Sequence, residues 1–427
     1  MRLRRLWDAI SLTGGPGADA GAGPGIGVYL GWGTLGPVRA RPDEHVLVLG
    51  PPRSGKTTRL VAPALLSHPG PAVVTSTKPD IFVMTTQQRS RLGPLWCWSP
   101  AGPVPDGAHQ LRWSPLSGCA DWDVAVARAH TLASAARPGA GGHDWHWVER
   151  AQALLAPLLH AAALEGTDVG ALMSWLHRRD LVVPLSVLTG AGASLAADVL
   201  AGVAQTDPRE LSGIFSTADG VLAAYRSQAA LQAARQPNFD AEELVERGGT
   251  VYICAPSSAQ ALFAPLVVAL LDHVRTATYR AQPYPPVLFA LDELANIAPL
   301  PDLATTLAEG GSQGLVVMGC LQDLSQARQR WGPAADGFLT LFANKLLLPA
   351  IADTATLKAV STLAGEVEVE LASQSYQGGL LRRQRSVTWS TRRQPRLSEA
   401  DIAGGAPGTA LLVRGARFSR VHLPGAL

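Results

Sequence analysis

The chain has 427 residues, 47% of them hydrophobic, and a formal net charge of +2 at neutral pH, which allows two or three domains with apolar cores. A net charge this close to zero argues against a globally basic surface, so any contact with DNA must come from a local patch or a pore. The sequence has no run of about 18 apolar residues that would predict a membrane-spanning helix, and its four cysteines are too scattered for a zinc site or a redox motif.

The first 44 residues are expected to form a flexible lead-in. Residues 1–7 are basic and could touch anionic lipid, with a disordered tail as the alternative; no long apolar segment follows that would make them a signal peptide. Residues 13–44 are dominated by Gly, Pro and Ala, and residues 27–30 form one short predicted strand.

A phosphate-binding loop is predicted directly after this lead-in. Residues 46–49 are apolar and predict a buried strand, and an apolar pattern compatible with a helix resumes at residue 60. The glycines between them let backbone N–H groups curl around phosphates at a helix N-terminus. A Gly/Pro-rich turn with a chance lysine is the alternative, which the flanking strand and the doubled threonine at residues 57–58 disfavour. The predicted nucleotide-binding residues are Gly50, Pro51, Pro52, Arg53, Ser54, Gly55, Lys56, Thr57 and Thr58.

Strands and helices alternate after the loop. Residues 72–77 and 95–98 are predicted strands, and a helix is predicted to start at residues 78–80, where proline suits a first turn and Asp80 its positive end. This rhythm predicts a parallel sheet with helices on both faces.

Residues 115–245 are expected to form an all-helical insertion domain, because apolar residues recur there at spacings of three and four. Three tryptophans in it, Trp145, Trp147 and Trp175, could stack on bases. The alternative is that they belong to a helical core, as most aromatic residues in helices do.

Strand character returns at residues 250–254, and a long apolar helix at 259–278 precedes further strands at 287–291, 315–321, 345–348 and 410–413. The nucleotide-binding domain is therefore expected to be discontinuous, formed by residues 45–114 and 246–427. The polar, arginine-rich segment 373–396 is predicted to be a flexible loop or a hairpin.

Two carboxylates follow the apolar strand at 287–291, where α/β sheets place their ligands. Lys56 would reach the β and γ phosphates of ATP, and Thr57 and Asp292 would hold Mg²⁺. Glu293 would polarise the attacking water. The alternative for Asp292 is a cap on the following helix.

Gln322 comes directly after the next predicted strand and is the third predicted catalytic element. A polar residue at that place can sense the γ-phosphate, although a glutamine there can also be a simple helix cap. The order of loop, acid pair and glutamine is typical of RecA-like motors, in which ATP lies between neighbouring subunits.

The motifs at residues 50–57, 74–80, 291–296 and 314–326 together resemble the coupling-protein ATPases of type IV secretion, the TraG-like family of conjugative DNA transfer. Residues 113–116 and 143–149 resemble the entry to that family's helical domain. The resemblance extends from about residue 27 to the C-terminus. It implies a RecA-like P-loop NTPase fold with an inserted all-helical domain.

The same resemblance implies a homo-oligomeric ring, usually a hexamer, that uses ATP and Mg²⁺ to feed single-stranded DNA or proteins into a secretion channel. It also implies that the helical insertion recognises the substrate or the relaxosome. The implied location is cytoplasmic, with peripheral attachment at the inner face of the cell membrane as an option.

Two departures from the family pattern stand out. Relatives usually begin with transmembrane helices, which this sequence lacks, so membrane contact is expected to be indirect, through a partner, or absent. Relatives also often carry an arginine between the acid strand and the glutamine, but residues 308–313 contain no basic residue. Either another residue, such as Arg328 or Arg330, takes that role, or hydrolysis is slow. The alternative for both arginines is a solvated surface position.

Two other functions remain open at this stage. One keeps the motor but makes it a double-stranded DNA translocase of the segregation class. The other is a nucleotide-gated docking receptor that hydrolyses little ATP and recruits effectors through residues 115–245.

Overall fold

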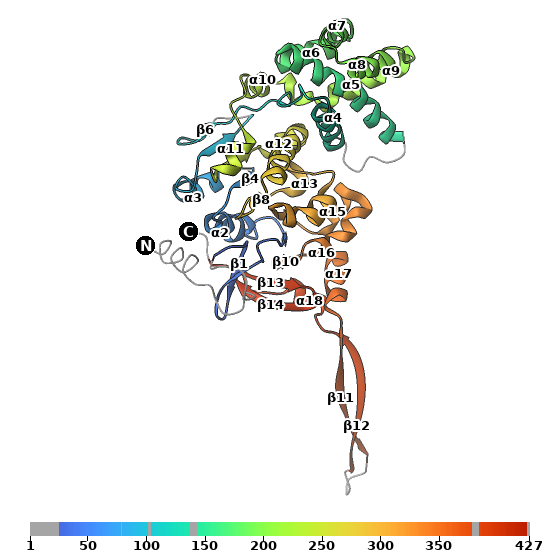
Figure 1. Cartoon of the computed structure of the whole chain (residues 1–427). Coiled ribbons are helices and arrows are strands. Elements are labelled where there is room, and N and C mark those ends of the chain that lie inside the picture. The colour runs from blue at the N-terminus through green and yellow to red at the C-terminus, as the bar shows by residue number, and fades with distance from the viewer. Residues whose placement is uncertain (1–24, 78, 101–103, 137–142, 378–383, 425–427) are drawn as a thin grey trace.

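The computed structural model describes residues 25–77, 79–100, 104–136, 143–377 and 384–424 (Figure 1). Its centre is a sheet of twelve strands. In spatial order these are β2 (Gly36–Arg39), β1 (Tyr29–Gly33), β14 (Arg417–His422), β13 (Thr409–Arg414), β10 (Asn344–Leu347), β3 (Val46–Leu49), β9 (Leu315–Leu321), β8 (Val287–Leu291), β4 (Ala72–Ser76), β7 (Thr250–Cys254), β5 (Leu95–Trp98) and β6 (His109–Gln110).

The strands from β10 to β6 pair in parallel, which confirms the predicted α/β fold. Parallel strands covered on both faces read as continuous apolar runs, and all four residues of β3 are buried. The four strands β13, β14, β1 and β2 extend the sheet in antiparallel pairing.

Helices cover both faces of the parallel part. Val46 and Val48 contribute to a core with residues of η1 (Thr57–Val61), α2 (Ala62–Ser67) and α3 (Asp80–Arg89). Leu47 and Leu49 point to the opposite face and join a second core that includes α12 (Gln260–Ala281). This alternation follows from the two-residue period of a strand.

The remaining helices of the sheet region follow β7, β8, β9, β10 and β12. They are η3 (Ser257–Ala259), α13 (Leu294–Ile297), α14 (Leu303–Glu309), η4 (Gly310–Gln313), α15 (Leu324–Trp331), η5 (Gly332–Gly337), α16 (Phe338–Leu341), α17 (Thr354–Ala364) and α18 (Glu399–Ala403).

Every element described between β6 and β7 is helical. These are α4 (Trp122–Ala136), α5 (His143–Glu165), α6 (Val169–Arg178), α7 (Val182–Gly190), α8 (Ser194–Ala204), α9 (Pro208–Val221), η2 (Ala223–Arg226), α10 (Gln228–Ala234) and α11 (Ala241–Glu246).

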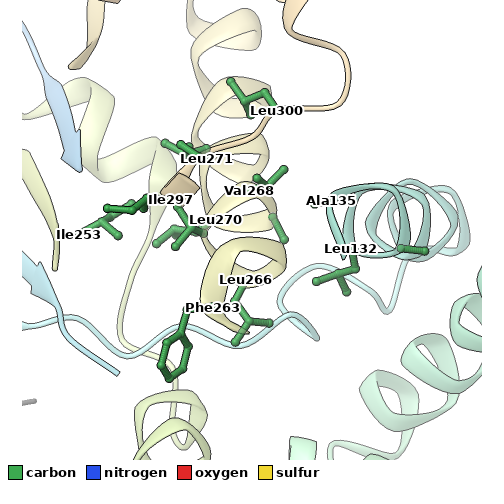
Figure 2. Close-up of a cluster of buried hydrophobic side chains, with 14 of the residues drawn as sticks. Leu132, Ala135, Ile253, Phe263, Leu266, Val268, Leu270, Leu271, Ile297 and Leu300 are labelled. Carbon is green, nitrogen blue, oxygen red and sulfur yellow. The ribbon is translucent and has the colours of Figure 1, made fainter. Parts of the chain in front are cut away.

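The helical segment packs directly against α12 of the sheet region. Figure 2 shows Leu132 of α4 facing the α12 residues around Leu266, and all of them belong to one core. The buried Arg128 of α4 donates a hydrogen bond of 2.9 Å from Nη1 to the carbonyl oxygen of Ala269. Trp113 donates from Nε1 to Nδ1 of His273, also on α12, at 3.0 Å.

One helix among the described residues, Ser257–Ala281, is long and apolar enough to cross a membrane by composition alone. However, 61% of its most apolar window is buried inside the structure. Its apolar residues pack in the core described above, which is typical of the central helix of an α/β protein.

The prediction of a loose lead-in has to be corrected for residues 25–44, while residues 1–24 lie outside the described residues. Tyr29 and Leu30 are fully buried, and Trp32 pairs with His422 of β14. The predicted strand at 27–30 is found at Tyr29–Gly33, and β2 was missed. Gly31, at φ +125°, accommodates the register shift between β1 and β2. This glycine, which in the sequence favoured a loop, is therefore part of a strand.

A hairpin of β11 (Glu366–Gln377) and β12 (Gln384–Pro395) forms a separate two-stranded sheet that projects away from the body (Figure 1). It begins earlier than the predicted segment 373–396, because Val367 and Val369 alternate with glutamates in a strand pattern.

His45 generates a prediction about acid stability. Its Nδ1 accepts a hydrogen bond of 3.0 Å from the backbone N–H of Val317, which joins the start of β3 to β9. Burial lowers the pKa of His45 to about 4. Because the folded state favours the neutral ring, its stability is complete above the unfolded pKa of about 6.5 and falls as pH drops toward 4.

We expect His45→Asn, whose amide oxygen can still accept a hydrogen bond from Val317, to make the free energy of unfolding less dependent on pH below 6.5. The slope of this free energy against pH should decrease by the equivalent of about one proton. The free energy of unfolding of both proteins, measured from pH 7 to pH 4.5, tests this. Equal slopes in the two proteins would contradict it.

Candidate nucleotide-binding site

Three neighbouring parallel strands bring the predicted site residues to one edge of the sheet. β9 lies between β3 and β8, with Leu49 paired to Leu321 and Leu291 paired to Gly319. The phosphate-loop sequence follows β3, Gln322 follows β9 and the acid pair follows β8. All three therefore meet at the carboxyl ends of the strands, where open α/β sheets bind ligands.

The loop of residues 50–56 depends on two glycines. Gly55 has φ +90°, which side chains other than hydrogen rarely adopt. A Cβ on Gly50 would lie 2.9 Å from both Cβ of Leu348 and Oγ of Ser54. The backbone N–H of Gly50 donates to the carbonyl oxygen of Leu321 at 3.2 Å, which anchors the start of the loop to β9.

The loop residues fit a phosphate group. The Lys56 ammonium donates to the carbonyl oxygens of Gly50 at 2.6 Å and Pro51 at 3.1 Å, and both acceptors are neutral. Oγ of Ser54 is buried without a hydrogen-bond partner among the described residues. An orphaned hydroxyl beside a cation and a glycine-bounded loop is what an anion of several oxygen atoms would satisfy.

The other predicted loop residues surround this centre. Pro52 and Arg53 lie on its exposed tip, and Arg53 has φ +62°. Thr58 lies in η1, the first turn after the loop, whose Arg59 N–H donates to the carbonyl oxygen of Gly55 at 2.9 Å.

A short hydrogen bond joins the loop to the acid strand. Oγ1 of Thr57 donates to Oδ2 of Asp292 at 2.5 Å, across 235 residues of sequence. Asp292 is only 7% exposed, and burial raises its pKa to about 6, with the nearby Glu293 adding to the rise while Thr57 and Lys56 oppose it. A hydroxyl and a carboxylate held this close are suitable oxygen ligands for Mg²⁺.

Glu293 is half-buried beside this pair. Its Oε2 accepts a hydrogen bond of 3.1 Å from Nδ2 of Asn296, one turn further along α13. The sequence analysis assigned Asn296 no role, although its spacing of three residues from the acid was a usable signal.

Gln322 lies at the end of β9, between the loop and the acid pair. Its backbone N–H donates to Oε1 of Gln326 at 2.9 Å, and Asp323 rather than Gln322 caps α15. The alternative that the Gln322 side chain is the N-cap of the following helix is therefore wrong. Its side-chain amide remains available for another role.

Gly319 lets the acid strand and β9 meet closely. A Cβ at this position would lie 2.7 Å from Cδ2 of Leu294, the residue directly after Glu293. A side chain there would force the Leu294 side chain to move from its place against β9. This requirement is not visible in a run of apolar strand residues.

The two arginines proposed for the neighbour's site have different surroundings. Arg328 is paired with Asp336, with Nε and Oδ1 3.2 Å apart. Arg330 is half-buried, with no described partner for its Nε, and burial lowers its pKa to about 10. Both lie on α15, the helix that follows Gln322.

The tryptophans of the helical segment divide between core and surface. Trp175 is 8% exposed and belongs to the core, which excludes base stacking by its ring. Trp147 is partly buried and lies against Gly213, where a Cβ would come within 2.5 Å of the indole. Only Trp145 of the three, 47% exposed, presents a free surface.

The fold and the geometry of this site define a RecA-like P-loop NTPase. The chain belongs to the type IV secretory system conjugative DNA transfer family, whose model matches residues 18–403. This confirms the resemblance to type IV coupling proteins inferred from the motifs.

Curated relatives agree with this family. The conjugal transfer protein TraG of Escherichia coli is 27% identical over 350 residues, which cover 71% of this chain and 53% of TraG. Protein VirD4 of Rhizobium rhizogenes is 24% identical over 350 residues, covering 78% of this chain and 51% of VirD4. The chain therefore spans about half the length of these relatives.

Solved structures share the fold. The unbound bacterial conjugative coupling protein TrwB matches with a TM-score of 0.66 at 21% identity, covering 91% of this chain and 87% of that chain. TrwB in complex with ADP and Mg²⁺ matches with a TM-score of 0.64, covering 90% and 85%.

The buried carboxylate at the site generates a prediction about stability. Above pH 6 the folded protein carries the Asp292 charge at a cost of about two pKa units, or about 3 kcal/mol at most. We expect Asp292→Asn, which keeps an acceptor for Thr57, to raise the free energy of unfolding of the unliganded protein at pH 8 by about 1–3 kcal/mol.

Chemical denaturation at pH 8 measures this gain, with the half-buried neighbouring carboxylate as control: Glu293→Gln should change stability much less. An Asp292→Asn protein less stable than its parent would show that the carboxylate is not held at a cost.

Proposed function

We propose that this chain is an ATP-hydrolysing motor that moves single-stranded DNA or nucleoprotein into a conjugative secretion channel. The single observation that carries the hydrolytic part is the hydrogen bond between Thr57 and Asp292. It joins the loop, the acid strand and Lys56 into one site, as an NTPase with a bound Mg²⁺ requires. The family membership carries the DNA-transfer part.

The site residues have separate roles in this proposal. The loop N–H groups and Lys56 bind the phosphates, with Ser54 supplying a further hydroxyl. Thr57 and Asp292 hold Mg²⁺, which would neutralise charge on the phosphate oxygens. These residues fix the phosphate chain against the edge of the sheet.

Glu293 acts on the water and Gln322 on the γ-phosphate. The hydrogen bond from Asn296 holds the Glu293 carboxylate in place, so that it can orient a water molecule and accept its proton. Gln322, between the loop and the acid pair, is placed to report phosphate loss to α15 through Gln326.

The assembly in this proposal is a homo-oligomeric ring, a hexamer, with ATP at the boundary between subunits. Positive charge from a neighbour stabilises the transition state in related triphosphatases. Arg330, on the helix that follows Gln322, is our candidate for that charge, because it forms no ion pair with the described residues, whereas Arg328 pairs with Asp336.

The helical segment is proposed to recognise the relaxosome or another secretion-system protein. Where it meets the edge of the sheet, Arg112, Asp168 and Arg235 line an open cleft of about 950 Å³. Arg235 and Asp168 form an ion pair of 3.4 Å there, so the cleft offers both charges to a polar partner. We place the protein in the cytoplasm, where ATP is available, with any membrane contact made through a partner.

Two substitutions test hydrolysis. We expect Lys56→Ala to lower ATP affinity at least tenfold and to abolish turnover, because it removes the cation at the loop. Glu293→Gln should keep ATP binding but lower turnover at least 100-fold, because it removes the base. Equilibrium binding of ATP and steady-state phosphate release, measured on the same samples, separate the two effects.

The matched control is Glu243→Gln, which removes the charge of an exposed carboxylate on α11, outside the strands and loop that form the site. It should change neither ATP affinity nor turnover. Persistent turnover in purified Lys56→Ala protein would overturn the motor. Tight ATP binding without turnover in the parent protein, at saturating DNA, would favour the docking receptor.

Stimulation of ATP turnover by single- or double-stranded DNA distinguishes the conjugative motor from a double-stranded DNA translocase. We expect single-stranded DNA to stimulate ATP turnover at least fivefold more than a duplex of the same length and total charge. Turnover is measured against both substrates at one fixed salt concentration, since binding to phosphates depends steeply on salt. Stronger stimulation by the duplex would favour the segregation-type translocase.

A further inference from the structure

The hairpin of β11 and β12 is unusual because nothing in the described structure covers it. Each strand has 12 residues, and the register runs without a bulge from Glu366 opposite Pro395 to Gln377 opposite Gln384. The hairpin extends away from the body (Figure 1). A two-stranded hairpin by itself is at best marginally stable in water, so a partner strand would stabilise it.

Both outer edges of the hairpin are free among the described residues, because each strand pairs only with the other. A long, regular edge presents a row of unpaired backbone N–H and C=O groups, to which another strand can be added. Proteins commonly block such edges with bulges, very short strands, proline or charged side chains. The hairpin has no bulge and its strands are long, whereas both strands carry charges and β12 ends in Pro395. Because the charges of the two strands differ in sign, they oppose the pairing of like strands but not of unlike ones.

Side chains on the hairpin are exposed as well. Trp389 is 67% exposed, and Val367 and Val387 are each 40% exposed. Trp389 and Val387 are two residues apart on β12 and therefore lie on the same face. Val367 pairs with Gln394 near the base and lies on the opposite face. The exposed apolar pair on one face, Trp389 and Val387, is compatible with an interaction surface.

The charges on the two strands have opposite signs. Near its base β11 carries Glu366, Glu368 and Glu370 and has no basic residue, whereas β12 carries Arg392 and Arg393 and has no acidic residue. Within the hairpin, Oε1 of Glu368 and Nε of Arg393 are 3.3 Å apart. Opposite charges on facing positions of antiparallel strands stabilise their pairing.

The separation of acidic residues on β11 from basic residues on β12 indicates which strand can pair with each edge. Pairing of β11 with another β11, or of β12 with another β12, brings no opposite charges together. Pairing of β11 with β12 of another copy does. In the register of the hairpin Arg393 shares the face of the three glutamates, and Arg392 lies on the opposite face beside Val369. The glutamates of each β11 would then lie between Arg393 of their own chain and Arg393 of the next copy. A double-stranded nucleic acid would gain from the arginines but would be repelled by the glutamates beside them.

We propose that β11 of one copy of this chain pairs antiparallel with β12 of the next copy. Such a head-to-tail contact uses two different surfaces and generates a closed ring when its rotation closes. The hairpins of all subunits would then join into one closed β-barrel on the ring, which leaves no free edge. This inference rests on the ring of the proposed function and adds the surface that builds it.

The base of the hairpin allows a clean test. The backbone N–H of Arg396 donates to the carbonyl oxygen of Gly365 at 2.8 Å, and Oγ of Ser361 donates to the carbonyl oxygen of Leu397 at 2.6 Å. The body therefore holds the two ends of the hairpin together by itself. Substitutions on β11 and β12 leave these contacts unchanged.

The test uses two charge-reversed proteins. One carries Glu366→Arg, Glu368→Arg and Glu370→Arg, and the other carries Arg392→Glu and Arg393→Glu. Each alone has like charges on both strands, so we expect its assembly to need at least tenfold more protein than the parent. Mixed in equal amounts, the two should regain the parent's assembly, because every contact between unlike copies again joins opposite charges.

Particle mass against protein concentration, with ATP and Mg²⁺ present, is the readout. Mixing cannot repair a defect inside a single hairpin, since each chain keeps its own reversed strand, so recovery identifies a contact between copies. Arg247→Glu, which reverses an exposed charge directly after α11, is the control and should assemble like the parent.

Several outcomes would overturn the proposal. These are a parent protein that stays monomeric, reversed proteins that assemble normally, and a mixture that fails to recover. Loss of DNA binding by Arg392→Glu, Arg393→Glu with unchanged particle mass would instead assign the hairpin to nucleic acid. Because the readout is mass rather than turnover, an absence of hydrolysis leaves this test intact.

Discussion

The insertion of β9 between β3 and β8 is the constraint on which the rest of the site depends. Parallel pairing puts the ends of these strands side by side, so a loop at residue 50, an acid pair at residue 292 and a glutamine at residue 322 become neighbours. The Thr57–Asp292 hydrogen bond joins the loop to the acid strand, and Gly319 leaves room for the side chain of Leu294, the residue after the acid pair. Burying the Asp292 carboxylate lowers the stability of the folded protein, and a bound cation would offset this cost.

α12 gives the molecule its second connection. Its apolar side chains fill the core over one face of the sheet, and its far side receives α4 of the helical segment (Figure 2). Arg128 and Trp113 add polar contacts to α12 at the same boundary. The helical segment and the strands that carry the site therefore share one close-packed core.

The hairpin and the body follow opposite designs. The central strands are apolar, parallel and covered on both faces, whereas β11 and β12 are polar, antiparallel and uncovered. Covered strands need no partner from outside. Among the described residues, the strand pair has two free edges with charges of opposite sign, to which further strands could pair. For this reason we assign the hairpin to assembly.

The sequence by itself determined the elements whose signals are local: the alternation of apolar strands and helices, the glycine-bounded loop with Lys56, and the acid pair after a buried strand. Tertiary structure decided what depends on distant partners. The glycine-rich residues 29–39 became strands only because β14 offers an edge, and Trp175 became core only because other helices surround it. The roles of Gly319 and Asn296 likewise required knowing which side chains meet, since a residue's neighbours in space are set by packing and pairing across the chain rather than by its own type.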